Sequence, residues 1–296
     1  GSYNTTGGMR SLGTSTTASS NTAMGYQSMF STTTGASNVA LGRDTLYYNT
    51  TGTRNTAVGT TALNANTTGS DNVAVGVQAL DANTTGLKNV ASGNYALGHQ
   101  ALQDNTTAND NTAVGWSALT DNTTGTDNAA LGRQALYSNT TGDDNAAVGR
   151  SALQNNTTGH DNTAVGMNAL FDNTTAGGNT AIGRSSLGNN TTGNNNTAVG
   201  YYSLQANTTG FQNTAVGDEA LESNTTASYN TAMGYTALRD TTTGQRNSGF
   251  GRGAIRDNTT GSYNVAIGMS ALSTNSSGDY NTALGYQAML SNTTAG

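Results

Sequence analysis

The sequence predicts an all-β chain that forms a parallel β-solenoid, with one 17-residue repeat in each turn and about seventeen turns. Three observations predict this fold. A motif of the type "NTAVGxxAL" followed by "NTTG" recurs every 17 residues, glycine and leucine hold fixed places within it, and the chain is rich in Asn, Thr and Gly, which are poor helix formers. A coil of this length suits short strands and tight corners, with each turn hydrogen-bonded to the next.

The repeats can be numbered from the Asn of the pentad "NTAVG", which we call position 1. Every interval between successive starts is 17 except one of 39, from Asn72 to Asn111, which is two periods plus five. The pentad occurs twice in "NVASGNYALG", and the second copy supplies the apolar Leu97. We therefore place a repeat start at Asn94 and predict that Asn89–Gly93 is an insertion looping out of the array. The starts are Asn4, Asn21, Asn38, Asn55, Asn72, Asn94, Asn111, Asn128, Asn145, Asn162, Asn179, Asn196, Asn213, Asn230, Asn247, Asn264 and Asn281.

The positions within the repeat differ sharply in residue type. Position 5 is always Gly, position 9 is Leu, Met or Ile, and position 4 is apolar in all but the first repeat. The 17 acidic and 11 basic residues all fall at positions 6, 7, 10, 11, 16 and 17. We expect positions 4 and 9 to be buried and these six positions to be exposed. Position 5 predicts a corner with positive φ or a close backbone approach, whereas position 15 accepts Ala as well as Gly, so that smallness matters there.

The Asn columns at positions 1 and 12 predict asparagine ladders, in which identical side chains stack along the coil and hydrogen-bond to one another. On a strand, Asn at position 12 and Thr at position 14 would point to one side and Thr at position 13 to the other.

The composition excludes several classes of function. Net charge is −6 and Lys88 is the one lysine, so no nucleic-acid partner is expected. There is no cysteine, and no apolar run approaches a membrane span. His99 and His160 occupy different repeat positions and no carboxylate recurs at a buried position, so we expect no enzyme, no cofactor and no metal site. Asp recurs at position 17 (Asp71, Asp110, Asp127, Asp144, Asp161), which we interpret as a solvated edge and not as a calcium site.

The organisation is that of one repeat-array domain covering residues 1–296, and the chain begins and stops within repeats, which suggests a segment of a longer array. Two large apolar side chains in each repeat are few for a coil standing alone. We therefore expect lateral or end-to-end self-association.

The repeats "NTAVGxxAL" and "NVAIGMSAL" (Asn264–Leu272) resemble those in the head domains of trimeric autotransporter adhesins. The whole repeat, as in "NTALGYQAMLSNTTAG", resembles repeats of phage and bacterial tail-fibre-like proteins. The adhesin resemblance implies a left-handed parallel β-roll, three chains side by side, and binding to host surfaces, with positions 4 and 9 filling the roll and the core between chains. The adhesin repeat is shorter, about 14 residues, and lacks the "NTTG" segment.

Two sets of residues are candidates for surface function. Exposed aromatic residues at position 6 could bind a surface or a sugar; they are Tyr26, Trp116, Tyr201, Tyr235 and Tyr286. Tyr229, Tyr263 and Tyr280 lie at position 17. The alternative for all of these rings is packing over neighbouring turns. The Asn of position 12 begins a glycosylation acceptor sequence in fourteen repeats, at Asn49, Asn66, Asn83, Asn105, Asn122, Asn139, Asn156, Asn173, Asn190, Asn207, Asn224, Asn258, Asn275 and Asn292.

These features favour a structural segment of an extracellular fibre or adhesin stalk, located outside the cell or on a cell or virion surface. Its expected partners are copies of itself, as a homotrimer or filament, and surface glycans or a host-cell surface. One alternative is a filament coated with glycans on Asn or Thr. The other is an ice-binding solenoid, against which the opposite facing of the two Thr of "NTT" argues.

Overall fold

The computed structural model of the chain describes residues 3–92 and 100–294, and within them it confirms the predicted all-β fold. Seventeen parallel strands form a β-solenoid of about 16 turns with 17 residues per turn, and the described residues contain no helix. Each turn contributes one strand of three residues at positions 2–4 of the repeat, and the rest of the turn consists of bends and tight turns.

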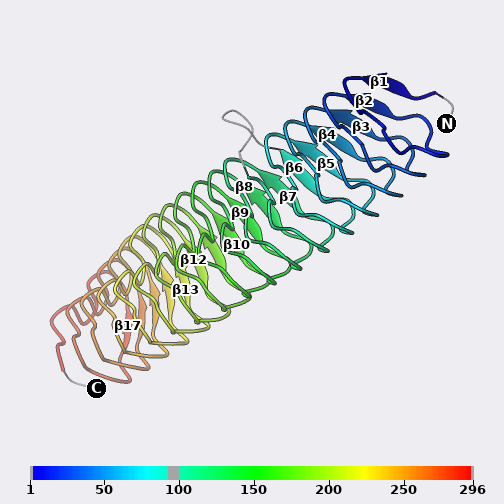
Figure 1. Cartoon of the computed structure of the whole chain (residues 1–296). Coiled ribbons are helices and arrows are strands. Elements are labelled where there is room, and N and C mark those ends of the chain that lie inside the picture. Colours follow the sequence, from blue (N-terminus) through cyan, green and yellow to red (C-terminus); the bar gives the residue numbers. More distant parts are fainter. Residues whose placement is uncertain (1–2, 93–99, 295–296) are drawn as a thin grey trace. The chain divides into compact units, whose positions relative to one another are not determined.

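Two compact units make up the chain, residues 1–150 and residues 151–296. Both units are built from the same 17-residue turn. The prediction that they form one repeat-array domain stays a prediction. In the first unit each strand pairs in parallel with the next, from β1 to β9 (Figure 1). The strands are β1 (Thr5–Gly7), β2 (Thr22–Met24), β3 (Val39–Leu41), β4 (Thr56–Val58), β5 (Val73–Val75), β6 (Val90–Ser92), β7 (Thr112–Val114), β8 (Ala129–Leu131) and β9 (Ala146–Val148).

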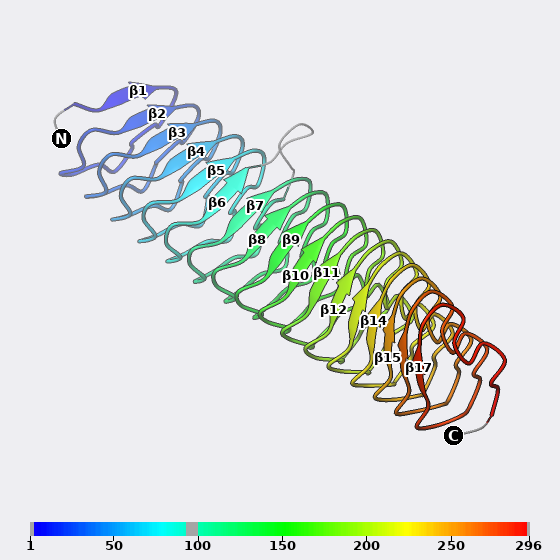
Figure 2. The ribbon, with the colours of Figure 1, turned by 180° about the vertical axis from the view of Figure 1, so that it is seen from behind.

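The second unit has the same construction. Its strands also pair each with the next in parallel, as Figure 2 shows from behind. They are β10 (Thr163–Val165), β11 (Thr180–Ile182), β12 (Thr197–Val199), β13 (Thr214–Val216), β14 (Thr231–Met233), β15 (Ser248–Phe250), β16 (Val265–Ile267) and β17 (Thr282–Leu284).

The insertion predicted at Asn89–Gly93 is wrongly placed. Val90, Ala91 and Ser92 form strand β6, in register with β5 and β7. Asn89 is fully buried and accepts a hydrogen bond from the backbone N–H of Asn111. The true repeat start is therefore Asn89, and seven residues, 93–99, separate Ser92 from Gln100 where a regular repeat has two. The extra five residues thus follow β6, and Asn94 and Leu97 lie outside the described residues. Asn89 is held by the hydrogen bonds of the asparagine ladder. These hydrogen bonds decide the repeat start, although the second pentad offers an apolar residue at position 4 where the first has Ser92.

The interior of each turn is small and partly polar. In the repeat that begins at Asn55, the buried apolar side chains are Ala57, Ala62 and Leu63, at positions 3, 8 and 9. The other buried side chains of this turn are those of Asn55 and Asn66, so both asparagine columns lie inside the coil. The prediction for position 9 is confirmed in every repeat except the first and the last, where Leu12 is half-exposed and Met289 is exposed. Every Asp, Glu, Lys and Arg is exposed or half-exposed as predicted. Several Ser, Thr and Gly at those six positions are buried.

The prediction that position 4 is buried is wrong. Leu131 is 41% exposed, and Leu41, Ile182 and Ile267 are exposed in the same way. Side chains alternate between the two faces of a strand. The Ala at position 3 points inward at 0% exposure, so positions 2 and 4 must point outward. The narrow interior accepts the small side chain and leaves the large one outside.

Positions 7, 9 and 17 of the described turns adopt the left-handed conformation, and they carry residues other than Gly except at Gly178 and Gly253. In one repeat they are Thr61, Leu63 and Asp71, with φ of 56°, 51° and 63°. This region costs an L-residue about 1–2 kcal/mol. This conformation directs the N–H groups of positions 7 and 9 in opposite directions along the coil. The Thr61 N–H donates to the carbonyl of Arg43 in the preceding turn, and the Leu63 N–H to the carbonyl of Ala79 in the following turn, both at 3.0 Å. The part of each solenoid turn that lies outside the strand therefore still hydrogen-bonds to both neighbouring turns.

The glycine of position 5 meets both conditions predicted for it. Gly132 has φ of +140°, and a Cβ there would lie 2.5 Å from the carbonyl oxygen of Gly149 in the next turn. At position 15 the φ of Gly125 is outside the left-handed region. A Cβ at Gly125 would lie too close to the carbonyl oxygen of Gly142, so space is tight there too. Ala18 and Ala108 are nevertheless buried at this position in other turns, so the coil adjusts to a methyl group at position 15, where no positive φ is required.

Replacing Gly132 by Val should lower the free energy of local opening by several kcal/mol, since positive φ alone costs about 1–3 kcal/mol and the branched side chain adds a clash with Gly149. Gly125→Ala, in the preceding turn, should cost clearly less. Amide hydrogen exchange of residues 129–131 measures both changes in place. Equal, small changes in the two variants would contradict this account of position 5.

Candidate functional site

One regular surface of the chain is the outer face of the strands, formed by the side chains at positions 2 and 4, which we call the outer β-face. Position 4 carries Val, Leu, Ile, Met or Phe in every strand from β2 to β17 except β6, where Ser92 stands. Position 2 carries Thr, Val, Ala or Ser. No residue at positions 1–5 is charged in any repeat. The outer β-face is thus an uncharged, largely apolar strip that the chain leaves uncovered.

The fourteen Asn predicted as glycosylation acceptors lie in one column on the inside of the coil. All are fully buried except Asn292, which is half-buried. The Asn66 side chain shows the arrangement: its Nδ2 donates to Asn49 Oδ1 at 2.8 Å and to the Gly69 carbonyl at 3.0 Å. Both amide hydrogens are used, and an attached sugar would replace one of them. The folded chain therefore does not present these Asn to a glycosyltransferase.

The two Thr of "NTT" do not face opposite sides. In the described residues positions 12–15 form no strand, so the alternation assumed for them does not apply. Thr67, at position 13, is half-exposed and its hydroxyl donates to the carbonyl of Thr84 at 3.0 Å. Thr68, at position 14, is exposed. Each turn therefore presents two neighbouring Thr to solvent, of which the first has already used its hydroxyl proton.

The five predicted aromatic residues all lie at position 6 and are exposed, but they are not gathered into one site. Three of them stand beside an Arg at position 6 of an adjacent turn. The Arg133 guanidinium lies 4.5 Å from the Trp116 ring, and those of Arg184 and Arg252 lie 5.7 Å from Tyr201 and Tyr235. Tyr26 and Tyr286 are exposed as well. Packing between neighbouring turns thus accounts for part of this column.

Position 17 forms a second column at the opposite edge, where neighbouring turns pair through side chains. In the first unit Arg54 holds Asp71 with two hydrogen bonds of 2.6 and 2.7 Å, and Lys88 Nζ lies 3.8 Å from Asp110 Oδ1. The hydrogen bonds from Arg54 lower the pKa of the Asp71 carboxyl. Two members of the predicted acidic file are therefore ion-paired.

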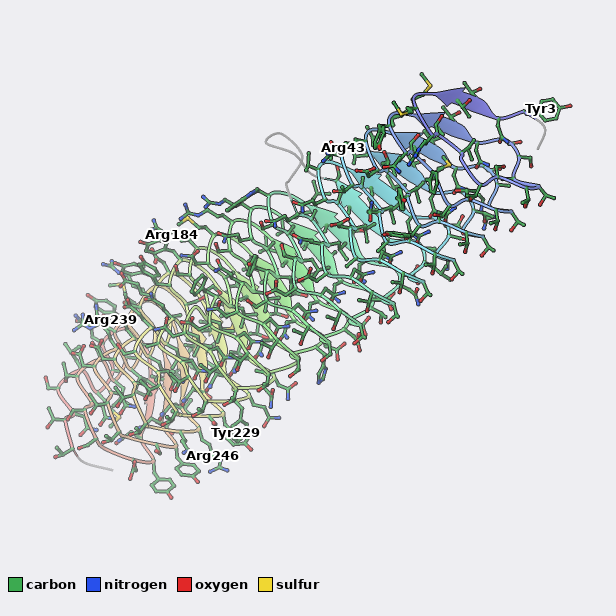
Figure 3. All side chains as sticks on the ribbon, viewed as in Figure 1. Tyr3, Arg43, Arg184, Tyr229, Arg239 and Arg246 are labelled. Atoms are coloured by element: carbon green, nitrogen blue, oxygen red, sulfur yellow. The ribbon has the colours of Figure 1, made fainter. Side chains whose placement is uncertain are left out.

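In the second unit the position-17 column carries three aromatic residues toward its end, Tyr229, Tyr263 and Tyr280. The Arg246 guanidinium lies 5.0 Å from the Tyr229 ring and 5.4 Å from the Tyr263 ring, and Tyr263 stacks on Tyr280 at 4.9 Å. Figure 3 shows Tyr229 and Arg246 projecting together from one edge, with Arg184 and Arg239 on the other. Tyr263 and Tyr280 therefore cover one another face to face, and Arg246 covers part of Tyr229 and Tyr263.

Metal-ligating side chains do not gather into one site in the described part of the chain. No cluster of three or more His, Asp or Glu that could hold a metal ion occurs there. His160 Nδ1 lies 2.8 Å from Asp161 Oδ2, with both side chains open to solvent, and His99 lies outside the described residues. Nor do residues 3–92 and 100–294 contain a helix with the length and apolar character to span a membrane.

Comparison with known proteins adds no relative: neither a protein-family model nor a curated protein matches the chain.

Two carboxyls at positions 10 and 11, those of Asp81 and Asp121, have raised pKa values. Burial, and then the charge of Asp104, raises the pKa of Asp81, and burial followed by Asp104 likewise raises the pKa of Asp121. A carboxyl with a raised pKa in the folded state contributes stability below its unfolded pKa, here 3.8, and that contribution is lost as the pH rises through the folded pKa.

Asp81→Asn should therefore unfold at a higher temperature than the parent chain at pH 7, and this difference should shrink as the pH falls toward 3. Thermal unfolding followed by circular dichroism across this range measures it. Asp127→Asn, at an exposed carboxyl, controls for the loss of one negative charge. A stability difference for Asp81→Asn that is the same at pH 3 and pH 7 would show that Asp81 is not strained.

Proposed function

We propose that this chain is a structural segment of an extracellular fibre or adhesin stalk, which acts by associating with copies of itself and by binding surfaces, without catalysis. One observation carries the proposal: the outer β-face is uncharged and repeats in turn after turn, with a large apolar side chain at position 4 beside Thr, Val, Ala or Ser at position 2, while the interior of the coil is already filled by Ala, Leu and Asn. Contiguous exposed apolar side chains on a protein surface are typical of interaction sites.

A copy of the same chain is the partner that fits this face best. Successive position-4 side chains are separated by one strand spacing, about 4.8 Å, and a partner must repeat at that spacing to fill the gaps between them along several turns. A second solenoid of this chain has the required spacing and the same side chains. The outcome is a homotrimer or a lateral filament, in keeping with the adhesin resemblance of the repeats. We place the assembly outside the cell or on a cell or virion surface, where surface glycans or a host cell are its further partners.

Ice binding is the second candidate, and one observation favours it: both Thr of "NTT" lie on the outer surface in a regular file. Against it, the hydroxyl proton at position 13 is donated to a backbone carbonyl, as for Thr67 and Thr84, so only one Thr per turn retains a free donor for water. A thermal-hysteresis measurement separates ice binding from self-association. The remaining alternative is a filament coated with glycans. Because the Asn residues of position 12 are buried, its sugars would be attached to Thr.

Self-association through the outer β-face can be tested by placing charge on it. Ile182→Lys, Met233→Lys and Ile267→Lys, combined in one chain, alter exposed residues of β11, β14 and β16. We expect the parent chain to sediment as a trimer or larger species at micromolar concentration and the triple variant to sediment as a monomer, because burying unpaired ammonium groups in an apolar contact is costly.

The matched control carries three lysines in the same repeats at position 14, as Thr192→Lys, Thr243→Lys and Ser277→Lys, all at exposed residues. It should associate like the parent chain. A parent chain that sediments as a monomer, or a position-14 variant that dissociates as fully as the position-4 variant, would contradict the proposal.

A further inference from the structure

Basic residues are scarce in this acidic chain, yet four of its 11 lie between residues 239 and 256. Three of these, Arg239, Arg252 and Arg256, line a single hollow of about 360 Å³ in the second unit, beside Tyr235. Pockets that hold small molecules begin at about 300 Å³, so the hollow has room for a monosaccharide.

The repeat explains how the hollow forms. Position 10 carries Arg in two consecutive turns, Arg239 and Arg256, and position 6 of the same turns carries Tyr235 and Arg252. Between these two rows lies position 7, where Gly253 has no side chain. A Cβ at Gly253 would find its nearest neighbours at 3.8 and 3.9 Å, the hydroxyl oxygens of Ser270 and Thr236. The floor at Gly253 thus carries no side chain of its own, and two hydroxyl groups lie beside it.

The charges in the hollow are only partly compensated. Arg239 and Arg256 each hold the adjacent carboxylate, Asp240 or Asp257, through Nε and Nη2 at 2.6–3.0 Å. A guanidinium has five N–H donors, so each keeps three for a ligand. Arg252 is exposed, lies over the Tyr235 ring, and forms no ion pair within the described residues.

The two ends of the hollow differ electrostatically. The pKa of Arg239 is raised, first by its hydrogen bond to Asp240 and then by the charges of Asp240, Glu219 and Glu222. The Arg239 end therefore already has carboxylates around it. An anion is best placed at the other end, between Arg252 and Arg256.

We propose that this hollow binds a hexuronate, an acidic sugar whose carboxylate is held by Arg252 and Arg256 and whose ring lies against Tyr235. The fork of an arginine side chain matches a carboxylate. Tyr235 is 48% exposed even with Arg252 over its ring, so it retains apolar surface for the C–H groups of a sugar, and Thr236 and Ser270 supply hydroxyl partners. The inference gives a ligand class to the surface binding proposed above. It is independent of self-association, because the hollow is built from positions 6, 7 and 10 and not from the outer β-face.

The test is a calorimetric titration of the whole chain with glucuronate, with glucose as the neutral sugar and inorganic sulfate as the bare anion. We expect glucuronate to bind with a dissociation constant on the order of 1 mM, and glucose and sulfate at least tenfold more weakly. Repeating the titration on the triple lysine variant of the outer β-face, with the same result expected, separates this binding from association.

Two variants and one control locate the site. Arg252→Ala should weaken glucuronate binding at least tenfold. Gly253→Gln should do the same without changing charge, since it fills the floor, and Gln is accepted at this position with positive φ at Gln27, Gln78 and Gln134. Arg184→Ala is the control: Arg184 also stands beside a tyrosine at position 6, but its repeat has Gly188 at position 10, and it should leave binding unchanged.

Each of three results would overturn the proposal. They are no glucuronate binding at about 20 mM, an equal loss in Arg184→Ala and Arg252→Ala, and sulfate binding as tightly as glucuronate, which would mean that the sugar ring makes no contact.

Discussion

The fold depends on a buried backbone carbonyl at position 15, which accepts hydrogen bonds from two asparagine side chains of its own turn. The Gly69 carbonyl oxygen receives Asn55 Nδ2 at 2.8 Å and Asn66 Nδ2 at 3.0 Å. The oxygens of the same two amides accept from the next turn, Asn55 Oδ1 from the Asn72 N–H and Asn66 Oδ1 from Asn83 Nδ2. An unpaired buried polar group costs about 1–3 kcal/mol, and this network pairs these groups turn after turn. It also holds each turn in register, because a slipped turn would leave both amides without partners.

A polar interior of this kind determines what the surface looks like. The two Asn side chains and a single Leu occupy most of the space inside a turn, so only small side chains fit at positions 3 and 8: Ala in most turns, and Ser or Thr at position 8 in a few, as at Thr45 and Ser186. The larger apolar side chain of position 4 must then lie outside, as Leu131 does. The apolar outer β-face, on which the proposed association rests, is therefore a direct consequence of the asparagine ladders inside.

The sequence predicted the fold class and the turn length, because both follow from the 17-residue period. It also predicted the buried Leu of position 9 and the corner at position 5, because a large apolar residue and an invariant Gly each have a clear structural role. It did not predict the left-handed φ of Leu63, since a leucine carries no signal for that conformation. It misplaced the insertion at Asn89 because apolar matching was weighed above the ladder. It placed position 4 inside because a large apolar side chain suggested burial. The alternation of side chains along the strand instead points position 3 inward and position 4 outward. The Arg252 hollow was missed because residues at positions 6, 7 and 10 of consecutive repeats lie far apart along the chain.

The chain itself contains a break in the ladder. Thr241 stands at position 12 in place of Asn, and both its hydroxyl oxygen and Asn224 Oδ1 of the preceding turn are buried with no hydrogen-bond partner among the described residues. The most direct test is Thr241→Asn, followed by hydrogen exchange of residues 231–233 and 248–250. An introduced amide can donate to Asn224 Oδ1 and accept from Asn258 Nδ2. At about 0.5–1.5 kcal/mol for each hydrogen bond, the account predicts a gain of about 1–3 kcal/mol in local opening free energy. Thr243→Asn, at an exposed residue of the same turn, should give no gain. A loss of stability in Thr241→Asn, or an equal gain in both variants, would contradict it.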